Sequence, residues 1–323
     1  MDGQTNSPVF IIGCERSGTT LLRAMLNSHP NIAIPYEASS FTGMTPVANP
    51  WNHVWNRKEI EDVLEFILTQ TKVRYWNLEL QEIIEKANFG MRVTYPEILT
   101  AVYRAHALKE GKNRWGDKTP VNAFDLPRII KAFPTAKFIH IVRDGRDVYL
   151  SWAKAEWARH DLKKAARKWK GWVWSAYRLA EKLGLSRYMV VRYETLVQNP
   201  RTELQKICMF LDEQFSENML EYYKKQDLIP EKDRSFHQLL SKPPEPSRML
   251  AWRKKLTQAE SEEFERIAGS ILLRYGYEVS QSMRSKARFA LAIQRVKDLT
   301  VPEWLRTLRA KRSEKVSVLK GVS

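Results

Sequence analysis

The chain has 323 residues, of which 43% are hydrophobic and eleven are tryptophans, a composition typical of a folded protein with a substantial core. Its two cysteines are too few for a disulfide framework or a cysteine-built metal site, so we expect a cytoplasmic protein. We expect no signal peptide at the polar N-terminus and no membrane span, since no apolar run approaches the required length of about 20 residues. The net charge of +16 indicates an anionic partner and leaves its class open.

The first predicted strand, residues 9–12, leads into the loop Gly-Cys-Glu-Arg-Ser-Gly and a helix predicted over 19–28. This order and glycine spacing are typical of a phosphate-binding loop. A nucleotide triphosphatase has lysine where this chain has Thr19, and the basic residue here is Arg16, within the loop. The loop therefore suits a smaller anion, such as a 5′-phosphate that carries one further group. The residues expected to bind it are Arg16, Ser17, Gly18, Thr19 and Thr20.

Helices and strands alternate along the rest of the chain. Hydrophobic periodicity predicts helices over 57–70, 78–88, 95–110, 121–133, 202–212 and 257–274, and strands over 32–34, 137–142 and 188–193. The first three of these helices are expected to form a cap on one side of a sheet. This pattern predicts an α/β fold: a three-layer, P-loop-like domain with a central parallel sheet, a helical cap and a C-terminal helical extension.

The composition changes near residue 280, where we place a domain edge, with a domain over 1–280 and a basic helical tail over 281–323. The tail holds eleven Lys and Arg residues against three acidic ones. Its basic residues alternate with apolar ones, as in an amphipathic helix that binds an anionic membrane surface. A helix packed on the body with a solvated basic face fits the same pattern.

Two longer stretches resemble the sulfotransferases that use 3′-phosphoadenosine 5′-phosphosulfate (PAPS). They are PVFIIGCERSGTTLLRAMLNSHP, similar to the 5′-phosphosulfate loop, and FIHIVRDGRDVYLSW, similar to the 3′-phosphate site. WGDKTP, VVRYETLV and SRMLAWRKKLT follow the order of the family, so the resemblance covers about residues 8–275. Within the first stretch, Arg-Ser-Gly-Thr-Thr-Leu, the following Arg-Ala-Met-Leu and the His-Pro are most similar to the protein-tyrosine and carbohydrate branches.

This resemblance implies PAPS as the co-substrate and a hydroxyl-bearing molecule as the acceptor. It implies that Glu37 is the general base and that Lys118 lies near the transferred sulfuryl group. We expect Arg16 and Lys118 to hold the bridging oxygen and the 5′-phosphate. Arg143 and Ser151 match the family's 3′-phosphate site. Independently of the family, Arg143 follows a predicted strand, at the carboxyl edge where open α/β sheets bind ligands.

Three further residues match the cofactor site of the family: Tyr193, Ser247 and Arg248. The chain also departs from the family's cytosolic small-molecule enzymes. It has no matching histidine base, and Ser-Arg-Met-Leu replaces their Arg-Lys-Gly triplet, so a 3′-phosphate contact from Ser247 or Arg248 stays an open point. The membrane-anchored, disulfide-bearing organisation of the animal tyrosine enzymes is also not expected.

Sulfuryl transfer needs an in-line nucleophile and stabilisation of the leaving phosphate, and we expect no metal to take part. Two other functions fit some of these features: a P-loop kinase or nucleotide triphosphatase, and a non-enzymatic protein that binds anionic polymers. No nucleic-acid-binding signature is present, so no specific nucleic-acid partner is expected. A sugar, tyrosine, lipid or natural product can all supply the acceptor hydroxyl. Aromatic residues that either line the acceptor pocket or pack in the core are Trp51, Trp55, Tyr75, Trp76, Trp115, Trp152 and Trp157.

Overall fold

A computed structural model describes residues 7–38, 41–154, 161–225 and 240–300 of the chain. It contains two compact units, Met1–Lys255 and Leu256–Ser323. The predicted domain edge near residue 280 and the predicted tail over 281–323 stay predictions, and residues 301–323 lie outside the described part.

A five-stranded parallel sheet with the order β2-β5-β1-β6-β7 forms the centre of the first unit. Its strands are β1 (Val9–Ile12), β2 (Ile32–Ala33), β5 (Arg114–Asp117), β6 (Lys137–Val142) and β7 (Tyr188–Arg192). Every residue of β1 is buried, which is expected of a central strand with both faces covered. Because the strands are parallel, all their carboxyl ends meet at one edge.

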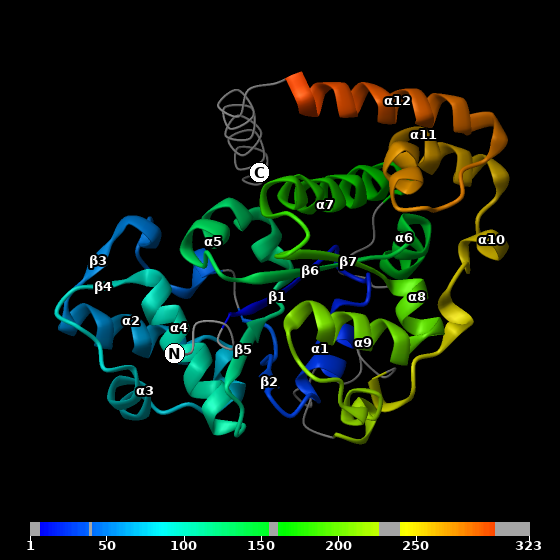
Figure 1. The fold of residues 1–323 in the computed structure, drawn as a ribbon. Coiled ribbons are helices and arrows are strands. Elements are labelled where there is room, and N and C mark those ends of the chain that lie inside the picture. Colours follow the sequence, from blue (N-terminus) through cyan, green and yellow to red (C-terminus); the bar gives the residue numbers. More distant parts are fainter. Residues whose placement is uncertain (1–6, 39–40, 155–160, 226–239, 301–323) are drawn as a thin grey trace. The chain divides into compact units, whose positions relative to one another are not determined.

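Helices cover both faces of this sheet (Figure 1). One face carries α1 (Thr19–Asn27), α8 (Tyr193–Gln198) and α9 (Pro200–Leu211), and the other carries α5 (Leu126–Ala132), α6 (Gly145–Ala153) and α7 (Leu162–Leu183). The predicted three-layer α/β fold with a central parallel sheet is confirmed.

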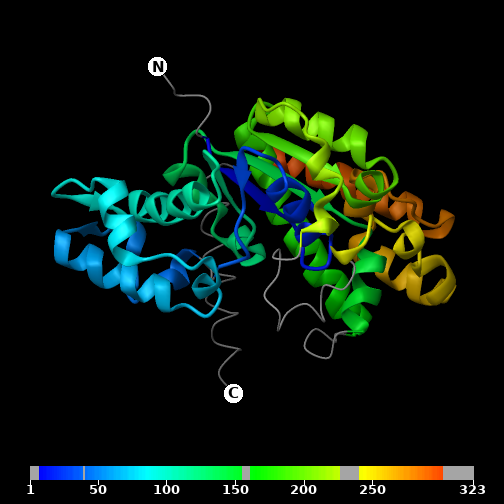
Figure 2. The ribbon, with the colours of Figure 1, turned by 90° about the horizontal axis from the view of Figure 1, so that it is seen from below.

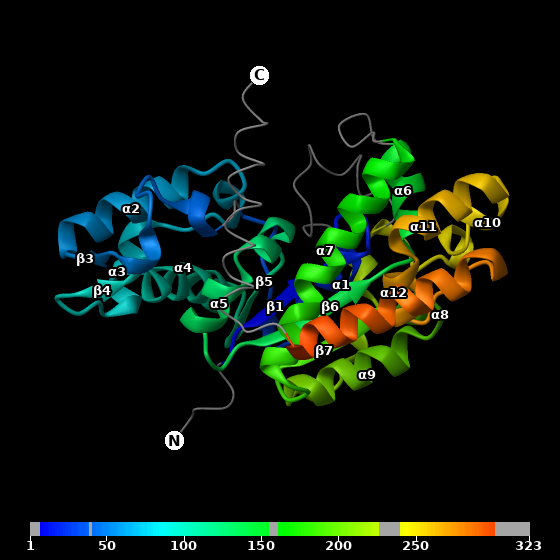
Figure 3. The ribbon, with the colours of Figure 1, turned by 90° about the horizontal axis from the view of Figure 1, so that it is seen from above.

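The cap lies beside the sheet, at the same side in the views from below and from above (Figures 2 and 3). It contains β3 (Val54–Trp55), α2 (Arg57–Thr69), α3 (Leu80–Ala87), β4 (Val93–Thr94) and α4 (Tyr95–Lys109). Capping boxes start α2 at Asn56 and α4 at Thr94, because each cap side chain pairs with a glutamate three residues later. The three predicted cap helices are therefore present, and the short antiparallel pair of β3 and β4 was not predicted.

Most of the aromatic residues considered for an acceptor pocket are part of the core. Trp55, Trp76, Trp115 and Trp152 are each at most 4% exposed. Trp115, for example, packs against the rings of buried neighbours in the sheet and the cap. Tyr75 is exposed and Trp51 is half-buried, while Trp157 lies outside the described residues. Core packing is therefore the role that the structure supports for these tryptophans.

One strand was missed, and one predicted helix was wrong in its extent. Strand β5 was not predicted, because Arg-Trp-Gly-Asp lacks the apolar run that marks the other central strands. The helix predicted over 121–133 is divided at Asp125 into a 3₁₀ turn, Pro120–Phe124, and α5. Pro127 stands in the first turn of α5 and has no N–H to continue a helix from the preceding turn, so the second helix begins afresh.

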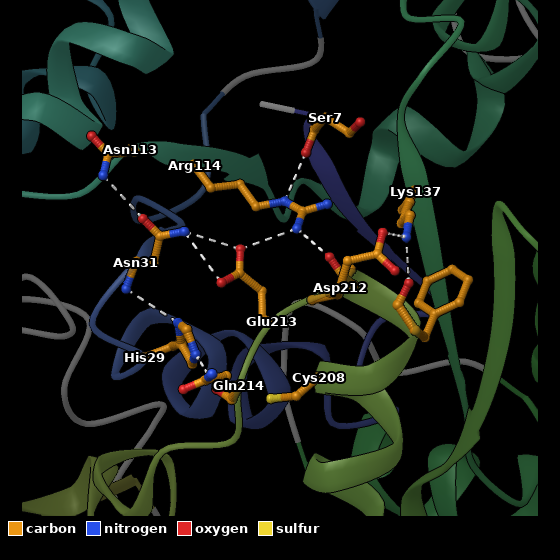
Figure 4. A network of polar contacts seen from close by, with 12 residues as sticks. Ser7, His29, Asn31, Asn113, Arg114, Lys137, Cys208, Asp212, Glu213 and Gln214 are labelled. Carbon is orange, nitrogen blue, oxygen red and sulfur yellow. Dashed lines mark hydrogen bonds and ion pairs between the residues drawn. The ribbon is translucent and has the colours of Figure 1, made fainter. Parts of the chain in front are cut away.

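A buried polar network closes the amino edge of the sheet, opposite the carboxyl ends (Figure 4). Arg114, the first residue of β5, donates to the carbonyl of Ser7 and pairs with Glu213 at 3.1 Å. Asn31 donates to both oxygens of the same carboxylate. Since Ser7 precedes β1 and Glu213 follows α9, this network fixes the sheet's amino edge and belongs to the scaffold.

The second unit contains α11 (Gln258–Arg274) and α12 (Gln281–Thr300). The capping box predicted at Thr257 and Glu260 is present at the start of α11. Helices α11 and α12 pack closely, because a Cβ added at Gly269 would lie 3.1 Å from Ala287. Within the described residues, no helix is both long and apolar enough to cross a membrane.

Candidate active site

The predicted phosphate loop connects β1 to α1 at the carboxyl edge of the sheet. Gly18 caps α1 with a φ of 93°, in the left-handed region that favours glycine. A Cβ at Gly18 would lie 2.4 Å from the ring of Tyr193, so a side chain does not fit there. The cap of α1 has no side-chain hydrogen bond and its first turn has no acidic residue. The positive end of this helix therefore faces the loop, as in anion-binding sites.

Lys118 follows β5 and reaches the same edge. It is 2% exposed, and its Nζ lies 3.4 Å from the hydroxyl oxygen of Thr20, on α1. The turn that presents it is fixed by Asp117, whose carboxylate accepts hydrogen bonds from the backbone and hydroxyl of Thr119 and from the amide of Asn122. Burial lowers the pKa of Lys118 to about 8, although the nearby carboxylate of Glu37 opposes this shift.

Glu37 lies in a segment held by other parts of the first unit. The guanidinium of Arg23 donates to the carbonyls of Ile34 and Pro35 at 3.0 and 2.9 Å. The indole of Trp76 donates to the carbonyl of Tyr36 at 2.9 Å. These bonds fix the backbone on the amino-terminal side of Glu37 and therefore hold its carboxylate at a defined position beside the loop.

The carboxylate of Glu37 lies between two lysines. Its oxygens are 3.5 Å from Lys118 Nζ and 3.1 Å from Lys72 Nζ, which comes from the cap. Burial raises the pKa of Glu37, but the charges of the two lysines outweigh burial and hold the pKa below its ordinary value. We call Glu37, Lys118, Lys72 and Thr20 the carboxylate cluster. Lys72 was not predicted, because nothing in its local sequence marks it.

A second group of cations surrounds the other end of the loop. Arg16 donates from Nε to the hydroxyl of Ser151 at 3.0 Å, and Arg143 donates to the carbonyls of Arg16 and Arg248 at 3.2 and 2.8 Å. The guanidinium of Arg143 also lies 4.5 Å from the ring centre of Tyr193. Burial, followed by the charges of Arg143 and Arg248, lowers the pKa of Arg16. We call these five residues the arginine cluster.

Most of the predicted site residues therefore lie in two clusters beside one loop. Arg16, predicted beside Lys118, points its side chain to Ser151 in the arginine cluster. Thr19 is buried at the start of α1. Ser247 is exposed in the 3₁₀ turn Pro246–Arg248.

The site has the chemistry to bind an anion with two separated phosphate groups. Among the described residues, the hydroxyl of Ser17 and Nε of Arg143 are buried without a hydrogen-bond partner. The three guanidiniums of the arginine cluster also repel one another, so an anion placed among them would be stabilised. These features fit a phosphate at the arginine cluster and another at the start of α1.

Comparison with known proteins shows the family to which the chain belongs. A family model described as "Sulfotransferase family" matches residues 8–217. The chain belongs to the sulfotransferase family. The predicted family is therefore confirmed, and so is the prediction that the chain is a sulfotransferase enzyme.

Two relatives indicate the branch. A protein-tyrosine sulfotransferase of Drosophila melanogaster is 29% identical over 231 residues, covering 69% of this chain and 42% of the relative. A putative protein-tyrosine sulfotransferase of Caenorhabditis briggsae is 27% identical over 220 residues, covering 67% of this chain and 69% of the relative. The predicted closeness to the protein-tyrosine branch is confirmed. The match thus spans less than half of the fly protein's length.

Solved structures share the fold. The sulfotransferase domain from the olefin synthase of Synechococcus PCC 7002 superposes with a TM-score of 0.60 and 24% identity, covering 86% of this chain and 98% of that domain. This similarity confirms the predicted P-loop-like architecture.

Proposed function

We propose that the chain transfers the sulfuryl group of PAPS to a hydroxyl group of an acceptor, with Glu37 as the general base. The observation that carries this proposal is the carboxylate cluster, which places a carboxylate and a buried lysine 3.5 Å apart beside the phosphate loop. A base and a cation in this arrangement can remove a proton on one side of the reacting group and stabilise charge on the other.

In this mechanism, Glu37 takes the proton of the acceptor hydroxyl as its oxygen forms a bond to sulfur. The bond between sulfur and the bridging oxygen breaks, and the 3′-phosphoadenosine 5′-phosphate (PAP) that leaves takes the electron pair. Lys118 donates a hydrogen bond to the leaving oxygen, and Thr20 helps to orient its Nζ, which lies 3.4 Å from the hydroxyl oxygen. The loop N–H groups at Ser17 to Thr19 hold the 5′-phosphate.

The arginine cluster is proposed to hold the 3′-phosphate. Arg143 and Ser151 were predicted for this role, and Arg16 joins them through its bond to Ser151. We propose that the guanidinium of Arg16 acts here in binding, while its backbone belongs to the 5′-phosphate loop. Tyr193 holds Arg143 through its ring and closes the loop against Gly18. No metal is assigned a role in this proposal.

PAP is expected to raise the melting temperature, whereas ATP with magnesium is not, because only PAP carries both a 3′-phosphate for the arginine cluster and a 5′-phosphate for the loop at the start of α1. At 100 times its Kd a ligand stabilises by about 2.7 kcal/mol, which corresponds to roughly 5 °C for a protein of this size. A thermal-shift titration measures this. Equal stabilisation by ATP and magnesium would favour the kinase or triphosphatase alternative.

Replacing Lys72 with methionine is expected to move the acidic limb of the pH–rate profile to higher pH. Glu37 acts only when deprotonated, and the charge of Lys72 helps to hold its pKa below the ordinary value. Without that charge the pKa of Glu37 rises. On acidification, Glu37 is then protonated, and activity is lost, at a higher pH than in the wild type. Lys58→Met, at an exposed position of α2, is the matched control. An unmoved acidic limb in Lys72→Met would show that the profile does not report Glu37.

The acceptor is proposed to be a hydroxyl of a tyrosine, carbohydrate, lipid or natural product. Tyrosine in a peptide is the first to test, since the relatives described above are named for it. The cytoplasmic location expected from the cysteine content also stays a prediction.

We propose that the predicted tail over 281–323 binds an anionic membrane surface; its described part is helix α12. Arg284 and Arg288 are exposed on it, and Phe289 is 70% exposed. Truncation after residue 280 is expected to abolish sedimentation with anionic liposomes at low salt, because it removes these cations and apolar residues together. Unchanged liposome binding after truncation would exclude the membrane role of the tail.

A further inference from the structure

Asp147 lies on α6, four residues after Arg143, and is 2% exposed. Both of its carboxylate oxygens accept backbone hydrogen bonds from a distant segment: Oδ2 from the N–H of Leu250 at 2.8 Å and Oδ1 from the N–H of Trp252 at 2.9 Å. Hydrogen bonds to a charged acceptor are about twice as strong as neutral ones. A buried carboxylate on α6 therefore fastens residues 248–252, which we call the strap.

Two further contacts hold the strap to the same turn. The guanidinium of Arg146 lies 3.4 Å from the ring centre of Trp252 and pairs with Asp144 at 2.7 Å. Arg143 donates to the carbonyl of Arg248 at 2.8 Å. The turn that supplies the proposed 3′-phosphate ligand Arg143 thus also holds the backbone of Arg248.

The strap adopts a conformation that it would not keep by itself. Leu250 has a φ of 56°, in the left-handed region that residues with a side chain rarely adopt. Arg248 is exposed, so packing does not fix its side chain. The two bonds to Asp147 flank Leu250 and oppose its relaxation. Without them, the backbone of Arg248 would lose its position beside the arginine cluster.

We propose that Asp147 is a positioning residue, which holds the strap so that Arg248 contributes to binding of the 3′-phosphate. The inference rests on the proposed function, because it concerns how the same site binds PAPS. The proposal also bears on the open question of whether Arg248 contacts the 3′-phosphate. Ser-Arg-Met-Leu replaces the family's Arg-Lys-Gly triplet here, and the carboxylate of Asp147 holds this segment at the site.

The electrostatic surroundings of Asp147 make this contact sensitive to pH. Burial raises its pKa to about 6, with a smaller rise from Asp144, and Arg143 opposes them. Tyr193 also faces it from the start of α8. The strap contributes the cation Arg248, and Arg253 follows directly after it, over the ring of Trp252. Since only the carboxylate form accepts both N–H bonds, the strap is expected to loosen as the pH falls through about 6.

The test measures Kd for PAP by calorimetry with the full chain and its Asp147→Asn, Arg248→Ala and double variants. Asp62→Asn, at an exposed position of α2, is the matched control. We expect each single variant to weaken binding about tenfold, and the double variant to bind about as weakly as either. The ratio of the Kd of Asp147→Asn to that of wild type should fall toward one below about pH 6, and the titration of PAP itself cancels in this ratio.

Wild-type affinity in Asp147→Asn, or single effects that multiply in the double variant, would overturn the inference. Melting temperatures show whether Asp147→Asn folds. If it does not, Arg248→Ala alone decides: its affinity for PAP should change less than that of wild type between pH 7 and pH 5, and an equal change would overturn the inference. A wild-type chain that binds no PAP would overturn the proposed function, and this inference with it.

Discussion

Glu37→Gln is expected to lower turnover by roughly 10²–10⁴-fold while leaving the Kd for PAPS nearly unchanged. The amide keeps the shape of the side chain and most of its hydrogen bonds, but it does not accept the proton of the acceptor hydroxyl. The effect should be this large because Glu37 is the carboxylate that lies 3.5 Å from Lys118, beside the loop. Single-turnover kinetics with saturating PAPS separate the chemical step from binding.

The alternative role of Glu37 is to pair with Lys118 and Lys72, and the same variant distinguishes the two roles. If turnover survives while the melting temperature or PAPS affinity falls, Glu37 is a structural partner of these lysines. Glu65→Gln, at an exposed position of α2, controls for the loss of one carboxylate. Its turnover should match that of the wild type.

Arg143→Ala is expected to weaken PAP binding by roughly 10²-fold, with a smaller effect on turnover at saturating PAPS. A hydrogen bond to a charged group contributes about 1.5–3 kcal/mol, and each 1.4 kcal/mol is tenfold in Kd. Arg143 is 7% exposed, and its Nε is buried with no hydrogen-bond partner in the described part of the chain, so an anion there would gain a bond that water does not replace.

The ligand series identifies which phosphate Arg143 binds. Adenosine 5′-phosphosulfate lacks the 3′-phosphate, so Arg143→Ala should weaken its binding much less than that of PAP. An equal loss for both ligands would mean that Arg143 supports the loop through the carbonyl of Arg16 instead. Arg57→Ala is the control, because that side chain is 86% exposed.

Local sequence patterns predicted much of the fold. The apolar strand, glycine loop and helix at the start of the chain predicted β1 and α1, and the apolar run at 137–142 predicted β6. Strand β5 was missed because it is buried by its position between strands β2 and β1, whereas its own residues, Arg-Trp-Gly-Asp, do not form an apolar run. Helix periodicity likewise overlooked the effect of Pro127, which divides the helix predicted over 121–133.

The candidate site was predictable only in part. The parallel sheet brings Glu37, Lys118 and Arg143 to one edge. The place of Arg143 after a predicted strand implied this position, and the resemblance to the family implied it for Glu37 and Lys118. Lys72 and Asp147 were missed, because their contacts join segments 35 and about 100 residues apart without a local motif. The sequence also does not predict the direction in which a side chain points, so the hydrogen bond from Arg16 to Ser151 was not predicted.

Transfer of label from radiolabelled PAPS tests sulfuryl transfer most directly. The chain and its Glu37→Gln variant are incubated with tyrosine peptides, carbohydrates and fractionated cell extract, and both labelled acceptor and PAP are quantified. We predict that the wild type labels a hydroxyl-bearing acceptor and forms PAP in equal amount, and that the variant does so roughly 10²–10⁴-fold more slowly. Binding of PAPS without any labelled product, together with magnesium-dependent hydrolysis of ATP, would contradict the account.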